Sequence, residues 1–375
     1  MYKLSEDEDL LRKMYKNFSI TNFRMFKDIS LFNFKRINLI AGKNNTGKTS
    51  LLESIYIHGG ALNPALTINV EGFRGITSWA AKRSYLSHDP VSPWDNLFHN
   101  LDNNKIIEFI SYDSDNEIEK TKIYIQKDPI PEIDDYPDPT LKSGDSVSLI
   151  AGTLVNTITV ENESYGKILK SYLRFDEGGM KKIPPFKEIP MQLVFHAARL
   201  RLSSKVDTDR FSQLQIDGNK DIVIDAIKII DDKIGNMIIS TIGDMPSLYV
   251  DIGLDKYIPL LASGEGMVRI VQILLEMNEA SNGIILIDEI ENGFHHSILP
   301  KVWDMIYRLS ELFNVQVFAT THSIETIKAA HDVYSKKDDY AFKLYRLENI
   351  NDKINAISYE KDELEAAIEL ELEVR

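Results

Sequence analysis

The sequence contains no cysteine in its 375 residues. This excludes disulfides, thiolate metal ligands and cysteine nucleophiles. It also lacks any run approaching the roughly 18 uninterrupted apolar residues of a membrane span. The N-terminus, MYKLSEDEDLLRK, is acidic where a signal peptide is basic and then apolar. These absences predict a cytoplasmic protein with no membrane association.

Basic residues are outnumbered, with 43 Lys and Arg against 57 Asp and Glu, for a net charge of −14. A protein that binds nucleic acid through its phosphates usually carries a basic excess. The short basic pair Lys181-Lys182 is more simply interpreted as solvated surface. The charge favours a protein partner, and the sequence leaves direct DNA binding open.

The pattern of apolar residues predicts an α/β fold. A short apolar strand at residues 37–40 runs into AGKNNTGKTS, and helical periodicity follows over residues 51–57. Towards the C-terminus helices and strands alternate, which is typical of a parallel sheet. The predicted helices are 266–279, 297–311 and 322–330, and the predicted strands are 283–288 and 314–319.

Between these parts the pattern changes. Residues 105–175 contain short β runs interrupted by an acidic, proline-rich loop at 129–139. Residues 206–243 are predicted to be mainly helical, and a hairpin follows at 247–261. We therefore expect an N-terminal lobe (1–100), a β-rich insertion or wing (101–205), a helical segment with a hairpin (206–258) and a C-terminal lobe (259–375).

Residues 42–49 fit G-x-x-x-x-G-K-[ST], the Walker A loop, at every position. The loop consists of Gly42, Lys43, Asn44, Asn45, Thr46, Gly47, Lys48 and Thr49, and Ser50 follows. Glycines let backbone N–H groups surround an anion at a helix N-terminus. Lys48 can reach the β and γ phosphates of ATP, and the Thr49 hydroxyl can bind Mg²⁺. A chance glycine-rich turn is the alternative, but the flanking strand and helix argue against it.

A second motif, an apolar strand that ends on two carboxylates, indicates that the bound nucleotide is hydrolysed. The apolar run at residues 284–287 ends on Asp288 and Glu289, as a Walker B strand does. Asp288 is placed to hold the Mg²⁺ shell, and Glu289 to orient or deprotonate the attacking water. Such runs also end ordinary strands, so this assignment depends on the Walker A loop.

Two weaker features complete the pattern. Ser263, Gly264, Glu265 and Gly266 stand one helix before the Walker B strand, where N–H groups and a hydroxyl can bind phosphate. Arg269, one turn further, could add positive charge on the same face. His322 follows the next strand, and we interpret it as a sensor of the γ-phosphate, although a lone histidine is more often structural.

The order of these motifs resembles that of ABC-type ATPase heads of the SMC, RecF and Overcoming-Lysogenization-Defect group. It is most similar to the "AAA-15" ATPases of bacterial anti-phage, abortive-infection and PARIS-like systems. ITNFRMFKDISL, LIDEIENGFHHSIL and QVFATTHSIETIKAA carry the resemblance, which is strong over residues 17–58 and 258–375. The implied fold is a P-loop NTPase, an ABC/SMC-like head with an inserted β-rich and helical region.

The resemblance implies that two heads enclose ATP as a homodimer or a higher homo-oligomer. Residues 263–266 then act on the nucleotide of the other chain, and residues 291–293 form the D-loop at the contact. Arg24 matches an arginine that approaches nucleotide in related heads. Gln192 and Arg199 are both candidates for the glutamine-loop residue.

Two family features are missing from the sequence. There are no heptad arms for a coiled coil, and 53 residues follow His322, too few for a Toprim nuclease domain at roughly 100 residues. An effector must then be a separate chain. The first hypothesis is an ATPase that acts as the sensor or scaffold of a two-component anti-phage system, with a separate, Toprim-type nuclease effector and a phage-encoded trigger. The alternative is a RecF/SMC-like DNA-repair ATPase that clamps DNA, and a scaffold with negligible turnover would differ only in rate.

Overall fold

The computed structural model describes residues 14–60, 63–75, 94–126, 157–164, 166–176, 179–183, 192–198, 204–242 and 245–375. They belong to two compact units. The first comprises residues up to 16, 33–52 and 192–375, and the second comprises 17–32 and 53–191. This division differs from the four consecutive segments expected from the sequence, because the chain passes between the units more than once.

A six-stranded sheet forms the centre of the first unit in its described part, in the order β16-β15-β3-β14-β13-β9. Its strands are β3 (Ile37–Gly42), β9 (Leu193–His196), β13 (Ile284–Ile287), β14 (Gln316–Thr320), β15 (Phe342–Ile350) and β16 (Lys353–Tyr359). All pairings are parallel except the β15–β16 hairpin. Every residue of β3, β13 and β14 is buried, as their apolar runs predict for strands covered on both faces.

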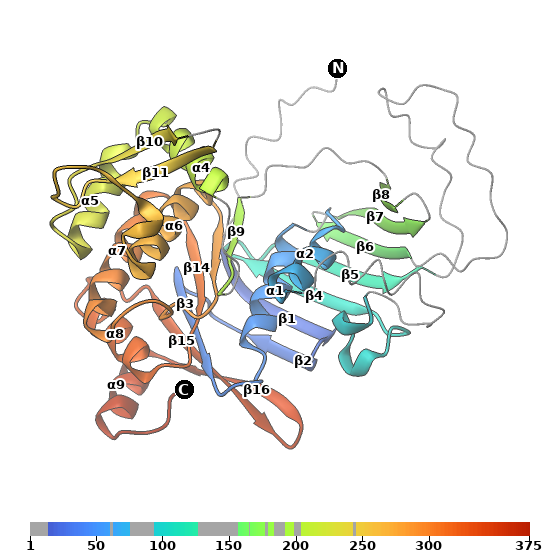
Figure 1. Ribbon diagram of the computed structural model, residues 1–375. Helices are drawn as coiled ribbons and strands as arrows, with labels where there is room; N and C mark the ends of the chain where they lie inside the picture. The colour runs from blue at the N-terminus through green and yellow to red at the C-terminus, as the bar shows by residue number, and fades with distance from the viewer. Residues whose placement is uncertain are drawn as a thin grey trace, which may run out of the picture. The chain divides into compact units, whose positions relative to one another are not determined.

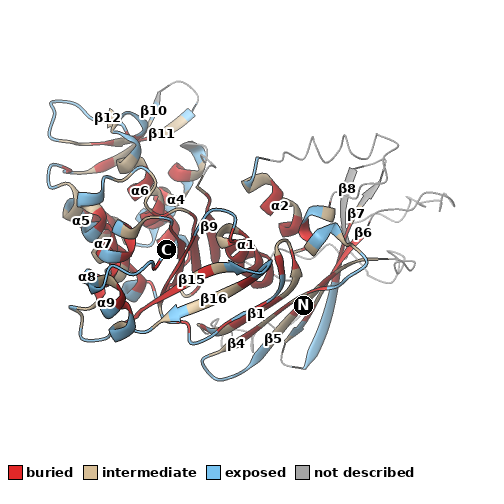
Figure 2. Ribbon diagram, turned by 90° about the horizontal axis from the view of Figure 1, so that it is seen from below, coloured by how far each residue is buried: buried red, intermediate tan, exposed pale blue. Residues whose placement is uncertain are grey.

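Helices cover this sheet. In the first unit they are α4 (Ser204–Ile216), α5 (Lys220–Ile230), α6 (Glu265–Glu279), α7 (Leu299–Leu312), α8 (Ile324–Tyr334) and α9 (Lys361–Glu369), with 3₁₀ turns at Leu260–Ala262 and His296–Ile298. Figure 1 shows α6, α7 and α8 beside the sheet. Their apolar faces share one core with β3, β13 and β14, and the buried strands are red in Figure 2. The predicted alternation of helix and strand over residues 266–330 is confirmed.

A small three-stranded sheet, in the order β10-β11-β12, also belongs to the first unit. Its strands are β10 (Met237–Ile242), β11 (Met245–Val250) and β12 (Ile258–Pro259). The hairpin expected at 247–261 is present, but residues 237–242 are a strand, where the sequence analysis expected helix. The β-branched run in β10 pairs antiparallel with β11, from Met237 opposite Val250 to Ile242 opposite Met245.

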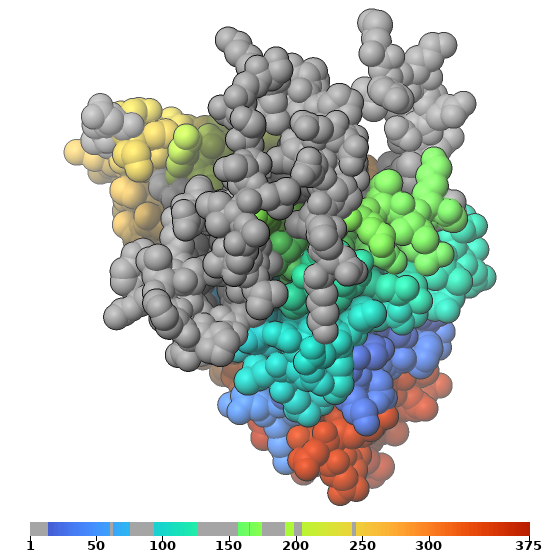
Figure 3. All heavy atoms as spheres, turned by 90° about the vertical axis from the view of Figure 1, so that its right-hand side faces the viewer, coloured from blue at the N-terminus to red at the C-terminus, as the bar shows by residue number. Residues whose placement is uncertain are grey.

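The described part of the second unit has a seven-stranded sheet in the order β2-β1-β4-β5-β6-β7-β8. Its strands are β1 (Tyr15–Phe23), β2 (Phe26–Leu31), β4 (Ile107–Asp113), β5 (Ile118–Ile125), β6 (Thr157–Ser164), β7 (Lys167–Asp176) and β8 (Gly179–Ile183). In Figure 3 the residues of this part of the chain are coloured from blue through teal to green. The β-rich middle is thus confirmed as a sheet, but it also takes β1 and β2 from the expected N-terminal lobe.

The remaining described elements are α1 (Lys48–Gly59), α2 (Leu66–Phe73) and 3₁₀ turns at Asp95–Leu97 and His99–Leu101. The boundary between the two units falls inside α1, after Leu52. The acidic loop expected at 129–139 lies outside the described residues. Across the part of the chain that the structure describes, none of the helices has both the length and the apolar character to cross a membrane.

Candidate functional site

The candidate site lies where β3, β13 and β14 end together. Ile40 is opposite Thr320, and Ile287 is opposite Ala319. Because the strands are parallel, the residues that follow them meet at one edge of the sheet, which is where open α/β sheets bind ligands. The structure therefore brings the Walker A loop, Asp288 and the segment leading to His322 together, as the sequence predicted.

The geometry of the Walker A loop depends on its glycines. Gly42 has φ +149°, and a Cβ there would stand 2.6 Å from Thr46 Oγ1 and 2.7 Å from the carbonyl oxygen of Leu347. Gly47, with φ +95°, precedes α1. The Thr46 hydroxyl closes the loop by donating to the carbonyl oxygen of Lys43 at 2.8 Å. The loop thus has the tight path of a phosphate-binding turn before a helix N-terminus.

Lys48 lies against its own loop. Its Nζ donates to the carbonyl oxygens of Gly42 at 2.6 Å and Lys43 at 3.0 Å. Burial lowers the pKa of Lys48, although the neighbouring carboxylates Asp288 and Glu289 act in the opposite direction. The Lys48 ammonium can turn its N–H donors from these loop carbonyl oxygens to phosphate oxygens when a nucleotide binds. The position of Lys48 is therefore suited to binding the phosphates of a nucleotide.

Asp288 is held by two threonine hydroxyls. Thr49 Oγ1 lies 3.1 and 3.2 Å from its two carboxylate oxygens, and Thr320 Oγ1 donates to Oδ1 at 2.6 Å. Burial raises the pKa of Asp288, and these hydrogen bonds partly offset that effect. A hydroxyl beside a carboxylate suits Mg²⁺, which binds through few protein oxygens together with substrate phosphates. The described residues contain no cluster of three or more His, Asp or Glu that could hold a metal ion by itself.

Glu289 adopts a left-handed backbone conformation with φ +49°. Its N–H donates to Thr320 Oγ1 at 2.8 Å, and its Oε2 accepts from Asn292 Nδ2 at 2.6 Å. Non-glycine residues in this conformation are uncommon and concentrate at functional sites. The backbone turn and these two bonds fix where the candidate base points.

Arg269 supports the same turn from α6. Its Nη2 donates to the carbonyl oxygens of Asp288 and Glu289, at 2.9 Å each. The side chain is buried, and these two bonds direct its positive charge, which the sequence suggested for the face of residues 263–266, to the Walker B loop. Sequence reasoning also missed Thr320, whose hydroxyl contacts both acidic residues. The sequence signal that could have identified Thr320 is its position at the C-terminal end of β14, at the same sheet edge as Asp288.

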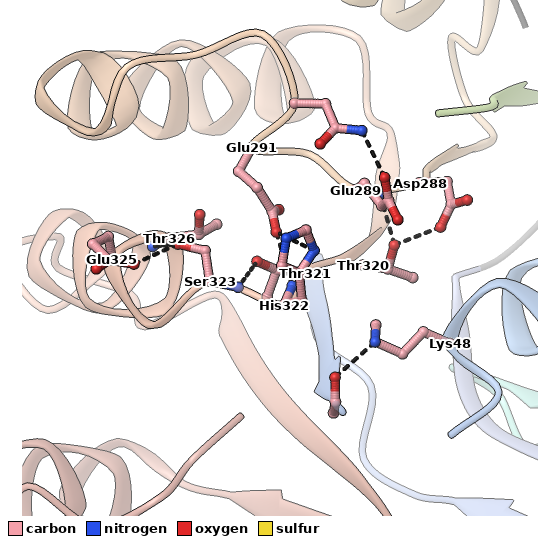
Figure 4. A network of polar contacts seen from close by, with 12 residues as sticks. Lys48, Asp288, Glu289, Glu291, Thr320, Thr321, His322, Ser323, Glu325 and Thr326 are labelled. Carbon is pink, nitrogen blue, oxygen red and sulfur yellow. Dashed lines mark hydrogen bonds and ion pairs between the residues drawn. The ribbon is translucent and has the colours of Figure 1, made fainter. Parts of the chain in front are cut away.

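His322 is half-exposed at the end of β14, and Glu291 holds it there (Figure 4). Glu291 Oε1 accepts from the backbone N–H of His322 at 2.8 Å and lies 3.1 Å from Nδ1 of its ring. Ser323 then caps the N-terminus of α8, with its hydroxyl accepting from Thr326 N at 3.1 Å. The predicted sensor is therefore placed at the sheet edge by an acidic residue of the Walker B loop.

Residues 263–266 lie at the start of α6 and are partly or fully exposed. Gly264 has φ +107° and caps the helix. The Ser263 hydroxyl donates to the carbonyl oxygen of Leu260 at 2.7 Å. A Cβ on Gly266 would lie 2.8 Å from the carbonyl oxygen of Gly293, so the Glu291–Gly293 loop packs directly on this helix end.

The remaining candidates differ. Arg24 belongs to the second unit, where its side chain is largely buried and forms ion pairs with Glu53 at 2.7 Å and Glu71 at 2.9 Å. Gln192 is wrong as a glutamine-loop residue at this edge, because its carbonyl oxygen accepts from Ile284 N at the opposite end of β13. Arg199 lies outside the described residues.

Comparisons with known proteins find a matching family model and similar proteins. A family model described as "AAA domain, putative AbiEii toxin, Type IV TA system" matches residues 37–328. An ATP/GTP phosphatase of Helicobacter pylori is 26% identical over 384 residues, covering 96% of this chain and 99% of the relative. Among solved structures, an SMC head bound to the C-winged helix domain of ScpA covers 95% of this chain and 99% of its own (11% identity, TM-score 0.48). The SMC head domain from Thermotoga maritima covers 92% and 99% (10% identity, TM-score 0.40).

The family match includes the Walker A loop, Asp288, Glu289 and His322. Together with the strand order around β3, it confirms the predicted α/β fold class with a P-loop ATPase domain.

Proposed function

The chain belongs to this AAA-domain family and is an ATPase, and we propose that its ATP site is completed by a second copy of the chain. The observation that carries the proposal is the exposure of the residues that precede α6. Lys48, Asp288 and His322 converge at one sheet edge, whereas Ser263 and Gly264 are partly or fully exposed, and the Ser263 hydroxyl donates within its own turn to the carbonyl oxygen of Leu260. Ser263, Gly264 and Gly266 then face the γ-phosphate bound by another copy.

Each residue has a role in hydrolysis. N–H groups of residues 42–49 and the Lys48 ammonium bind the phosphates, and Thr49 and Asp288 would hold Mg²⁺. When bound, the ion would supply charge neutralisation at the phosphate oxygens. Glu289 accepts a proton from the attacking water as its oxygen bonds to the γ-phosphorus. The bond from that phosphorus to the bridging oxygen breaks, giving ADP and phosphate, and His322 binds the transferred phosphoryl group.

The substitution Glu289→Gln tests this assignment. It keeps the shape and the bond from Asn292 but removes the proton acceptor, so hydrolysis should fall by about 100-fold or more, while ATP stays bound. The variant should then form a stable dimer in ATP and Mg²⁺, measured by light scattering, whereas the unmodified chain should dimerise only transiently. Unchanged turnover would remove Glu289 as the base.

We further propose that this ATPase is the sensor or scaffold of a two-component anti-phage system with a separate effector, a Toprim-type nuclease, released by a phage-encoded trigger. The matched family's description refers to a toxin of a toxin–antitoxin system, and the net charge of −14 suits a protein partner. Expression from the native gene neighbourhood should yield a complex that contains the effector. A chain that purifies alone would oppose this proposal.

The alternative function, an ATPase that clamps DNA, is tested by DNA binding. That function requires affinity for duplex DNA that rises with ATP and falls steeply with salt. A filter-binding assay at low salt, with and without ATP, measures it.

A further inference from the structure

We propose that Glu291 is a positioning residue that acts through His322: its carboxylate sets the orientation and tautomer in which the imidazole meets the γ-phosphate. This inference rests on the proposed ATPase function and on the role of His322 in it. It adds a second acidic residue of the Walker B loop to the machinery, with a task different from that of Glu289.

The contacts define that task. One carboxylate oxygen, Oε1, faces both the backbone N–H of His322 at 2.8 Å and its ring Nδ1 at 3.1 Å (Figure 4). A carboxylate is only an acceptor, so Nδ1 carries the ring proton that points to it. This leaves Nε2 as the nitrogen that can contact a ligand.

His322 needs such a restraint. Its side chain is 51% exposed, whereas that of Glu291 is 11% exposed. A half-exposed imidazole samples several rotamers unless a bond holds it, and fixing it during the reaction would cost free energy. A largely buried carboxylate bound to the backbone and the ring of the same residue removes that freedom before nucleotide arrives.

The second carboxylate oxygen makes a purely structural role a poor explanation. Glu291 Oε2 is buried and has no hydrogen-bond partner among the described residues. Such unsatisfied acceptors are uncommon in folded proteins and cost stability. Among the described residues, the hydrogen-bond and ion-pair contacts of the Glu291 side chain are both with His322.

The geometry also connects the motifs. Asn292, the next residue, binds the carboxylate of Glu289 at 2.6 Å. Gly293 packs its carbonyl oxygen against Gly266 at the start of α6. A shift of this loop would therefore move groups that contact Glu289, His322 and the start of α6, the surface proposed to face a second copy.

A double-mutant cycle in the full chain tests the inference. Glu291→Gln, His322→Ala and the double variant are compared by kcat/KM for ATP and by the affinity for Mg-ADP. We expect kcat/KM to fall about 100-fold in His322→Ala and about 10-fold in Glu291→Gln. In the double variant it should stay within about twofold of His322→Ala, because groups that act as a unit are not additive. The affinity for Mg-ADP, which lacks the γ-phosphate, should be unchanged throughout.

Glu325→Gln is the matched control. Glu325 lies three residues after His322 and accepts from the Ser323 hydroxyl at 2.8 Å, so this variant removes a nearby negative charge without touching the ring. Its kcat/KM should equal that of the unmodified chain. Additive losses in the cycle, or an equal loss of Mg-ADP affinity in Glu291→Gln, would overturn the inference. An unmodified chain without ATP hydrolysis would instead overturn the proposed function itself.

Discussion

At the scale of single residues, Thr320 shows how few atoms organise the site. One hydroxyl donates to Asp288 Oδ1 at 2.6 Å and accepts from Glu289 N at 2.8 Å. It thereby fixes the candidate Mg²⁺ ligand and the backbone of the candidate base, although Thr320 is on a different strand. Arg269 holds the carbonyl oxygens of the same two residues from the other side. The acidic pair is thus restrained on both its side-chain and its backbone groups.

Gly42→Ala is a prediction at this scale. Alanine would have to adopt φ +149° and place Cβ 2.7 Å from the carbonyl oxygen of Leu347. Backbone strain of this kind costs about 1–3 kcal/mol, and the contact forces the loop to move. We expect weaker ATP binding and a lower midpoint of chemical denaturation.

Gly72→Ala is the matched control for that variant. It lies within α2, and a Cβ there meets nothing within 4 Å. Alanine in a helix is favoured by about 0.5–1 kcal/mol, so stability should rise slightly and ATP affinity should stay the same. Equal ATP affinity in the Gly42→Ala variant and the unmodified chain would contradict the loop geometry.

At the scale of elements, α6 connects the parts of the site. It begins at the exposed Ser263–Gly266 turn and carries Arg269 to the Walker B loop. Further along, Glu276 is fully buried between a histidine and an arginine, with Oε2 at 2.7 Å from His196 Nδ1 and Oε1 at 3.0 Å from Arg210 Nη1. Because His196 ends β9 and Arg210 belongs to α4, this network fixes the helix against a strand and a second helix.

Glu276→Gln should therefore destabilise the fold by about 3–5 kcal/mol at neutral pH, since it removes the buried carboxylate that His196 and Arg210 both contact. Burial raises the pKa of Glu276, but the charges and hydrogen bonds of His196 and Arg210 outweigh it, so the pKa in the folded protein lies below its usual value. The stabilisation is then fully present above the unfolded pKa, about 4.3, and is lost as pH falls through the folded pKa. The difference in unfolding free energy between the Glu276→Gln variant and the unmodified chain should decrease at acidic pH, as measured by chemical denaturation at several pH values.

Glu279→Gln controls for the loss of charge. Glu279 is on the same helix and also pairs with Arg210, at 2.7 Å, but its side chain is 47% exposed. An exposed ion pair contributes about 0–1 kcal/mol. A similar loss of unfolding free energy in Glu276→Gln and Glu279→Gln would show that the buried network stabilises the fold no more than an exposed ion pair does.

At the scale of the whole molecule, the proposal of a shared site predicts complementation between defective chains. Lys48→Ala removes phosphate binding, and Ser263→Arg blocks the start of α6, so each variant alone should be inactive. In a mixture, a pair of unlike chains has one site with an intact Walker A loop and an intact Ser263. ATP hydrolysis should therefore return on mixing, measured by phosphate release.

A mixture of Lys48→Ala with Glu289→Gln provides the control. Both changes affect the same half of a site, so neither site of a mixed pair is intact and activity should stay absent. If the first mixture is also inactive while both chains fold and associate, the site is not shared in the proposed way.

The sequence alone determined the fold class and the main candidates for site residues of this chain. The Walker A loop, the strand that ends on Asp288 and Glu289, and the position of His322 are encoded by short local spacings and by continuous apolar runs, which need no knowledge of distant contacts. The β15–β16 hairpin was missed, although Asn351 and Asp352, both with positive φ at its turn, are a usual hairpin signal.

Only the tertiary structure decided which groups hold those residues. Thr320, Arg269 and Glu291 reach the acidic loop or His322 from β14, α6 and the segment after β13, and strand pairing sets those distances. The same pairing placed Gln192 at the opposite end of the sheet and assigned β1 and β2 to the seven-stranded sheet. Contacts between segments far apart in the chain depend on how buried faces pack, and a local sequence pattern does not predict that packing.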